Sequence, residues 1–286
     1  MKEEFRPRLS PDEYQIIKDY RNGVKPVVKQ SKKSVKILLF DIETIGIQAM
    51  TWGLWKQNVN TEFIFSDWFI LSWAAKWLDE DAVYSSVLTP KEVADHDDFR
   101  IVTELWDMLD EADVIIAHNL EKFDKKKVNT RFLFHQLPPP SHYDTFDTLK
   151  QLRENFAITS NRLDYVNKWL GLEGKIKTEA SLWMRCIKGE QEALTEMETY
   201  NKEDVMALER NYLRIRGWSK DHPNVNLFDD SGIVKCPNCG SENLEWNGYK
   251  TTKVSRYKAY TCSDCGHIGH SRYSDMTKEE RKIIVR

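Results

Sequence analysis

Residues 35–44 read VKILLFDIET, and this stretch decides the fold class of the chain. An apolar run of this length predicts a buried β-strand, which ends in Asp41 and Glu43. Alternate residues of a strand share a face, so both carboxylates are expected to point the same way. Adjacent carboxylates repel each other unless a cation lies between them, and hard cations prefer oxygen ligands. The pattern therefore favours a metal site, although D-x-E alone occurs by chance in many chains.

The rest of the chain predicts helices around a sheet. Further strands are expected within 69–78, within 82–88 and at 113–119, where DVIIAHN is apolar enough to be buried on both faces. Helical spacing is found at 97–110, about 121–135, 145–155, 161–170, 178–187 and about 190–215. Strands that alternate with helices in this way predict an α/β fold.

The two ends of the chain differ from its middle. Residues 1–34 predict an appended helix, with Ser10 and Glu13 as a capping box, followed by a basic linker. The main domain is expected over 35–220, and a small module over 231–286 follows a Pro-, Gly-, Asn- and Asp-rich break. Both ends are basic and the middle is acidic; phosphate contacts and solvated tails explain the basic ends equally well.

The composition is typical of a soluble globular protein, with 41% hydrophobic and 30% charged residues among 286. The longest apolar candidate for a membrane span, 68–78, is short and contains Lys76, so no membrane association is expected. The first ten residues have no apolar segment of the kind that a secretory signal needs. A cytoplasmic protein is therefore expected.

Two further acidic motifs follow in the middle region. Residues 119–124 (NLEKFD) begin where the strand at 113–119 ends, so Asp124 is placed to point back at the sheet edge. A helix-start aspartate that caps backbone amides would give the same pattern. Tyr200 and Asp204 are four residues apart and share a helix face, which alone is more often a core tyrosine beside a surface acid.

The three motifs together, in this order, resemble the proofreading exonuclease domain of family B DNA polymerases and its free-standing relatives. These proteins form the DEDD exonuclease superfamily, whose fold is RNase H-like, and the resemblance covers about residues 35–216. One branch has a histidine five residues before the last aspartate, a position that Thr199 occupies here. The other branch has a tyrosine four residues before it, as Tyr200 is here. The chain therefore resembles the tyrosine branch, DEDDy.

The resemblance implies a two-metal mechanism with two Mg²⁺ or Mn²⁺ ions held by Asp41, Glu43, Asp124 and Asp204. Asp41 would bridge both ions, Glu43 and Asp204 would complete the nucleophile-side site, and Asp124 would hold the leaving-group ion. Tyr200 would orient the attacking water, since a tyrosine with an ordinary pKa of about 10 is a poor base.

The resemblance also implies hydrolysis from the 3′ end of single-stranded DNA, with nucleoside 5′-monophosphates as products. Thr44 and Asn119 are carried over as contacts to the terminal nucleotides, while Asp144 and Asp147 are expected to be caps or fold supports. RNA trimming is an alternative, because nothing in the sequence reads the 2′-hydroxyl. A nucleic-acid-binding or regulatory protein with an inactive nuclease fold is another.

The long stretch at 46–68 departs from the simplest family pattern and carries Trp52, Trp55 and Trp68. Such aromatic residues stack on an unpaired terminal base in some proteins. Packing against the sheet is the favoured interpretation.

The C-terminal module contains two Cys-x-x-Cys pairs, each followed by glycine: Cys236, Cys239, Cys262 and Cys265. It resembles a zinc ribbon, in which four thiolates hold a structural Zn²⁺. Asn247-Gly248 is expected to form the hairpin turn between the pairs. His267 and His270 are not favoured as ligands.

Basic and aromatic residues are interleaved between the two cysteine pairs, which suits contact with nucleic acid. Docking of a protein partner on the ribbon is the alternative. Cys186, outside both pairs, is expected to be a buried core thiol.

Overall fold

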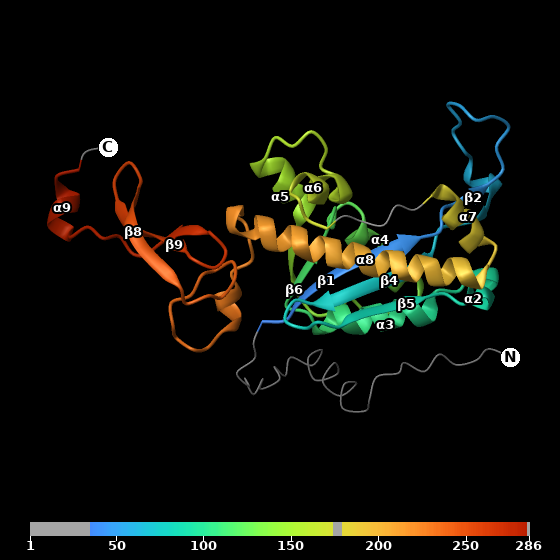
Figure 1. Ribbon diagram of the computed structural model, residues 1–286, viewed down its shortest axis with the longest axis horizontal. Helices are drawn as coiled ribbons and strands as arrows, with labels where there is room; N and C mark the ends of the chain where they lie inside the picture. The colour runs from blue at the N-terminus through green and yellow to red at the C-terminus, as the bar shows by residue number, and fades with distance from the viewer. Residues whose placement is uncertain (1–34, 174–178, 285–286) are drawn as a thin grey trace. The chain divides into compact units, whose positions relative to one another are not determined.

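A computed structural model describes residues 35–173 and 179–284, and its centre is a five-stranded mixed sheet (Figure 1). The order is β5-β4-β1-β6-β7; β1 pairs antiparallel with β4 and parallel with β6. The strands are β1 (Ile37–Thr44), β4 (Ile70–Trp77), β5 (Val83–Val87), β6 (Val114–Ala117) and β7 (Asp144–Asp147). The expected α/β fold is confirmed, while the helix and linker expected within 1–34 lie outside the described residues.

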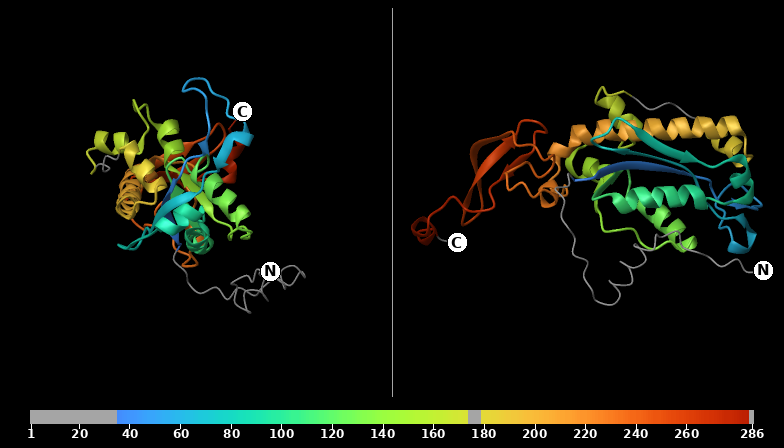
Figure 2. Two further views of the ribbon diagram at one scale, coloured as in Figure 1. Left: turned by 90° about the vertical axis from the view of Figure 1, so that its right-hand side faces the viewer. Right: turned by 90° about the horizontal axis from the view of Figure 1, so that it is seen from below.

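Helices flank the sheet, with α8 over one face and α3 on the other (Figure 2). The helices around the sheet are α2 (Pro90–Asp95), α3 (Phe99–Glu111), α4 (Asp124–Phe134), α5 (Thr148–Asn155), α6 (Leu163–Trp169), α7 (Ala180–Ile187) and α8 (Gln191–Ile215). The long helix expected at about 190–215 is confirmed, because 25 residues without Gly or Pro form α8. Among the described residues, no helix is long and apolar enough to cross a membrane.

The two faces of β1 belong to different hydrophobic clusters. Leu38, Phe40 and Ile42 pack in one cluster with residues of α3 and α4. Ile37 and Leu39 pack in the other, with the C-terminal half of α8. Because side chains alternate along a strand, Asp41 and Glu43 continue the second face, toward α8.

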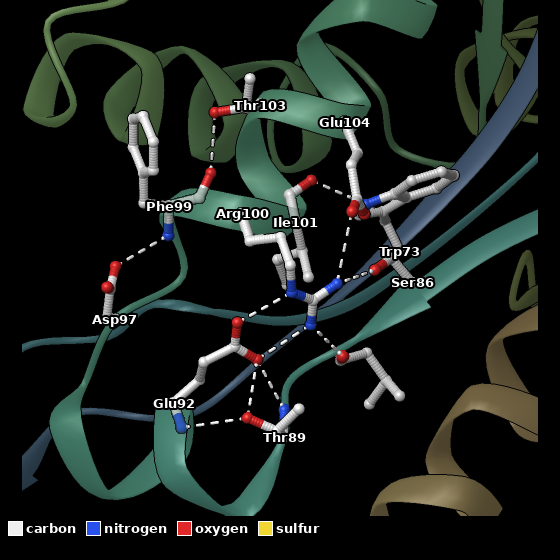
Figure 3. A network of polar contacts seen from close by, with 11 residues as sticks. Trp73, Ser86, Thr89, Glu92, Asp97, Phe99, Arg100, Ile101, Thr103 and Glu104 are labelled. Atoms are coloured by element: carbon white, nitrogen blue, oxygen red, sulfur yellow. Dashed lines mark hydrogen bonds and ion pairs between the residues drawn. The ribbon is translucent and has the colours of Figure 1, made fainter.

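Polar contacts fix α2 and α3 to the edge of the sheet (Figure 3). Thr89 and Glu92 form a capping box at the start of α2. The guanidinium of Arg100 in α3 donates to Glu92 at 2.8 Å and to Ser86 Oγ of β5 at 2.8 Å. The Arg100 hydrogen bond lowers the pKa of Glu92 to about 2, so this ion pair is charged at neutral pH.

The helix expected at 145–155 is shorter than predicted, and β7 was not anticipated. Residues 144–147 pair parallel with β6 from Val114↔Asp144 to Ala117↔Asp147, and α5 begins only at Thr148. A segment of four residues with an acid at each end is too short to show the alternation of apolar and polar residues that predicts a strand.

A second, three-stranded sheet forms the C-terminal module. It has the order β10-β9-β8, with β8 (Leu244–Thr251), β9 (Arg256–Cys262) and β10 (Ile268–His270), and it is followed by the short helix α9 (Lys278–Lys282). The turn expected at Asn247-Gly248 is wrong, because both residues lie inside β8. The chain reverses at 252–255 instead, where Thr252 N donates to Ser255 O at 2.8 Å.

Candidate active site

The central strand has an edge without a ladder partner beside the acidic residues. The β1–β6 pairing ends at Leu39↔Ile116, whereas the β1–β4 pairing continues to Thr44↔Ile70, with an irregularity at Glu43/Thr44. Within the described chain, no strand pairs with the β6 side of β1 past Leu39. This leaves room next to Asp41 and Glu43 for groups from other elements.

Three carboxylates converge at this position. One oxygen each from Asp41, Glu43 and Asp204 lie within 4.8 Å of one another. The first two come from β1, and the third comes from the buried side of α8, far later in the chain. Three carboxylates at this separation repel one another strongly without a cation, and hard divalent ions are bound by oxygen ligands of this kind.

Asp124 begins α4 and lies beside the same region of β1. It is 1% exposed, and neither carboxylate oxygen has a hydrogen-bond partner among the described residues. Burial, together with the smaller effect of the charges of Asp147 and Glu43, raises the pKa of Asp124 to about 8. The backbone amides of Asp124 and Ile42 lower this pKa in part, without reaching hydrogen-bonding geometry. Because a buried charge requires a compensating partner, this carboxylate suits the role of a cation ligand.

One positioning contact was not anticipated from the sequence. Asn201, fully buried in α8, donates from Nδ2 to Asp41 Oδ2 at 2.7 Å. Its Oδ1 accepts from Ser72 Oγ of β4 at 2.9 Å, which fixes the orientation of the amide. One oxygen of Asp41 is therefore held by the protein. The only sequence signal for this contact is that Asn201 directly follows Tyr200, within the motif that ends at Asp204.

Tyr200 and Asp204 share a side of α8, as their spacing predicts, and both side chains are buried. Tyr200 is 6% exposed, and its ring meets Trp183 of α7 edge-on at 6.0 Å between centroids. Thr44, the last residue of β1, is partly exposed beside the carboxylates.

Asp147 supports the turn that leads to Asp124. Its carboxylate accepts from the amide of Asn119 at 3.0 Å and from that of Glu121 at 3.3 Å, and it also caps α5. Asn119 has a left-handed backbone, with φ of 74°. The expectation that Asp147 is a cap or fold support agrees with these contacts.

The stretch at 46–68 forms a hairpin, built from β2 (Gln48–Ala49) and β3 (Ile64–Ser66), that leaves the sheet directly after β1 (Figure 1). Its base closes with the Ile45 amide donating to Phe69 O at 3.0 Å. The expected packing against the sheet is wrong for Trp52 and Trp55, which are 75% and 85% exposed.

The four paired cysteines also converge. One sulfur each from Cys236, Cys239, Cys262 and Cys265 lie within 4.8 Å of one another. Cys236 and Cys265 have sulfurs 3.6 Å apart, as do Cys239 and Cys262. This is too far for a disulfide bond of about 2.05 Å, and close to the roughly 3.8 Å edge of a tetrahedron with Zn–S bonds of about 2.3 Å. The donor set fits Zn²⁺.

The histidines near this cluster face other partners. His267 Nδ1 lies 3.3 Å from Gly217 O, and His270 Nε2 lies 3.0 Å from Lys250 Nζ. Cys186 is fully buried, and burial raises the pKa of its thiol to about 12, as suits an inert core residue.

Both donor sets suit the ions that the sequence predicts. The carboxylate cluster is all oxygen and suits Mg²⁺ or Mn²⁺, while four thiolates suit Zn²⁺. The acidic cluster lies on the central strand of a mixed sheet, beside a long helix, and its oxygen ligands suit a divalent metal ion. A family model of the RNase H superfamily matches residues 38–215, from the second residue of β1 to the last residue of α8.

The chain therefore belongs to the RNase H superfamily. Its fold is RNase H-like, with the mixed sheet flanked by helices. No curated protein matches the chain. Membership indicates a nuclease-type activity, a phosphodiester hydrolase that uses divalent metal ions on a nucleic acid substrate.

Proposed function

We propose that the protein is a metal-dependent 3′→5′ exonuclease of the tyrosine branch of the DEDD superfamily. It removes nucleoside 5′-monophosphates from the 3′ end of single-stranded DNA. The observation that carries the proposal is the meeting of Asp41, Glu43 and Asp204 within 4.8 Å. The polarity rests on the resemblance of the Tyr200–Asp204 spacing to that branch.

In the proposed mechanism, four carboxylates would hold two divalent ions, each in a different role. At such a site, divalent ions lower the pKa of an attacking water and stabilise the leaving oxygen. Asp41, one oxygen of which accepts a hydrogen bond from Asn201, would hold both ions, and Glu43 and Asp204 would complete the site on the side of the nucleophile. Asp124 would hold the ion on the side of the leaving group, and its buried oxygens, which have no hydrogen-bond partner among the described residues, support that role.

Tyr200 acts as a hydrogen-bond partner rather than as a base. It precedes Asp204 by about one helical turn on the same side of α8, so its hydroxyl is suited to orient a water at the carboxylate cluster. Thr44 and Asn119 contact the terminal nucleotides. The exposed Trp52 and Trp55, on the hairpin that follows β1, are suited to stack on unpaired bases.

The C-terminal module, 231–286, is proposed to be a zinc ribbon in which Zn²⁺ stabilises a fold with little core of its own. The nuclease domain is proposed to span 35–220, and the cytoplasm is the proposed location.

The test is digestion of 3′-labelled and 5′-labelled single strands by the wild type, Asp41→Ala and Asp204→Asn. In Mg²⁺ or Mn²⁺ the wild type should release labelled mononucleotide at once from the 3′ label and a ladder from the 5′ label. Each site variant should lose at least about a thousandfold in rate, since the ions contribute several kcal/mol.

Glu203→Gln is the matched control, because Glu203 adjoins Asp204 on α8 but is more exposed and lies outside the carboxylate cluster. Its rate should stay near that of the wild type. Release from the 5′ label first would refute the polarity, and no product with either metal would support the inactive-nuclease alternative. Faster digestion of a matched RNA strand would support RNA trimming.

A further inference from the structure

The sheet of the C-terminal module exposes an aromatic and basic face that neither the carboxylate site nor the zinc cluster uses. Strand β8 is exposed at every residue from Glu245 to Thr251. It is an edge strand, paired only with β9 among the described residues. Its side chains are therefore available to a ligand on both faces of the sheet.

A bulge in β8 decides which side chains share a face. Trp246 pairs with Tyr260 and Tyr249 pairs with Lys258, so three steps along β8 match two steps along β9. Gly248 has φ of 71°, the left-handed conformation that such a bulge requires. Without the extra residue, Trp246 and Tyr249 would point to opposite faces, because strand side chains alternate. The bulge puts both on the face of Tyr260 and Lys258.

This face combines flat aromatic rings with cations. Arg256, which precedes Lys258 on the same side of β9, lies over the ring of Tyr249 at 4.5 Å from its centroid. Trp246 packs on the buried Tyr260 at 5.1 Å between centroids and remains 47% exposed. We call Trp246, Tyr249, Arg256 and Lys258 the ribbon face. Asp275 lies 3.5 Å from Arg256 and 3.8 Å from Lys258, and the charge of Arg256 also acts on Glu280.

The opposite face has similar residues in a different arrangement. Lys250 pairs with Tyr257, one step along from the Tyr249–Lys258 pair. Here the cation and the ring are both engaged by His270, which lies 3.0 Å from Lys250 Nζ and 5.4 Å from the Tyr257 ring centroid. The two faces therefore carry the same residue types, and only the ribbon face presents two neighbouring exposed aromatic rings beside two cations.

We propose that the ribbon face binds single-stranded polynucleotide and holds the substrate strand of the nuclease. The identification of the ligand rests on the proposed function, and the chemistry of the face supports it independently. Aromatic rings stack on bases of any sequence, and cations beside them neutralise the phosphates between those bases. Lys258 is exposed on this face, so its ammonium group is available to a phosphate backbone.

The two faces provide a matched pair of variants for the test. Tyr249→Ala/Lys258→Gln changes one cross-strand pair on the ribbon face, and Tyr257→Ala/Lys250→Gln changes the neighbouring pair on the opposite face. Both are made in the full chain with Asp41→Asn, so that the strand stays intact during the measurement. Binding of a fluorescent oligothymidylate is followed by anisotropy at several salt concentrations, and zinc content per chain confirms that each variant retains its fold.

The ribbon-face variant should bind at least about tenfold more weakly, from the loss of one stacked base. Its plot of log affinity against log salt should be shallower by about 0.7, from the loss of one phosphate contact. The opposite-face variant should stay within about threefold of its parent. Equal losses in both variants, or no loss in either with zinc retained, would overturn the proposal.

Activity separates this inference from the proposed function. In chains with Asp41 intact, the ribbon-face variant should digest a trinucleotide at the wild-type rate and a long strand with a raised KM. If the wild type digests no strand but the difference in binding persists, the exonuclease proposal fails and the binding face stands. If digestion proceeds and the two faces are equivalent, only the binding face is wrong.

Discussion

Replacement of Asn201 by alanine tests whether Asp41 is positioned by the protein or only by the ions. In the structure, the Asn201 amide donates to Asp41 Oδ2 at 2.7 Å and accepts from Ser72 Oγ at 2.9 Å. The side chain is fully buried, so water cannot replace either contact in Asn201→Ala without entering the core. Asp41 would then be free to rotate away from the carboxylate cluster.

The size of the effect follows from these two contacts. A hydrogen bond to a charged group contributes about 1.5–3 kcal/mol to stability and a neutral one about 0.5–1.5 kcal/mol. The free energy of unfolding should therefore fall by about 2–4 kcal/mol. Loss of a residue that orients a metal ligand typically changes metal affinity or activity by about 10–100-fold. The Mn²⁺ concentration for half-maximal digestion should rise by about tenfold or more.

The assay measures the initial rate of 3′ digestion against Mn²⁺ and Mg²⁺ concentration, together with the melting temperature. Asn211→Ala is the control for stability alone. Asn211 is also fully buried in α8 and donates to Asn167 Oδ1 at 3.1 Å, about two turns beyond Asp204. It should lower the melting temperature without changing the metal requirement.

Ser72→Ala should have a smaller effect of the same kind, because it removes the contact that orients the Asn201 amide and leaves the amide itself. The reasoning is refuted if Asn201→Ala keeps the wild-type metal requirement and rate at temperatures where it is folded. Asn201 would then be a structural residue only.

Three other predictions follow from the structure. Burial alone would raise the pKa of Asp98, but hydrogen bonds from His135 and Arg131 outweigh it and hold that pKa below its ordinary value. Asp98→Asn should therefore cost about 3–5 kcal/mol at neutral pH, and urea titrations should show this difference shrink as the pH falls below about 4. Trp52→Ala/Trp55→Ala should raise KM for single strands several-fold with an unchanged melting temperature, since both rings are largely exposed. Cys262→Ser should release zinc and remove the protection of the β8–β10 amides in hydrogen exchange, while the amides of β1 stay protected.

The elements that carry the acidic cluster have clear local signals in the sequence, although each acidic motif is weak by itself. The apolar run of 35–40 marks β1, and alternation alone puts Asp41 and Glu43 on one side. Tyr200 and Asp204 share a side of α8 because an α-helix has about 3.6 residues per turn, so residues four apart lie on the same side. That the strand and the helix meet was predicted only from the resemblance to a family, because no local rule joins residues so far apart in the chain.

The failures are cases in which distant pairing decides the local structure. Asn247-Gly248 has the composition of a hairpin turn, and the glycine does adopt a positive φ. A bulge and a turn both need a positive φ at Gly248. The pairing of β8 with β9 continues on both sides of this glycine, so the structure has a bulge there. Likewise, β7 exists because β6 offers it a parallel partner, and Asn201 gains its role only where α8 crosses β1 and β4.

The register of β1 is the feature on which the whole site depends. Leu38, Phe40 and Ile42 fill the cluster under α3 and α4, so a slip by one residue would bury Asp41 and Glu43 there and turn the apolar side chains toward α8. The ladder to β6 also stops at Leu39, two residues before Asp41. The chain after β6 therefore turns at Asn119, whose backbone amide donates a hydrogen bond to the carboxylate of Asp147. Helix α4 then starts with Asp124, which lies beside Ile42. Strand β1 thus carries two carboxylates toward α8 and leaves an edge unpaired within the described chain on the side of β6, so that Asp204 of α8 lies close to these carboxylates and Asp124 of α4 lies beside Ile42 of the same strand.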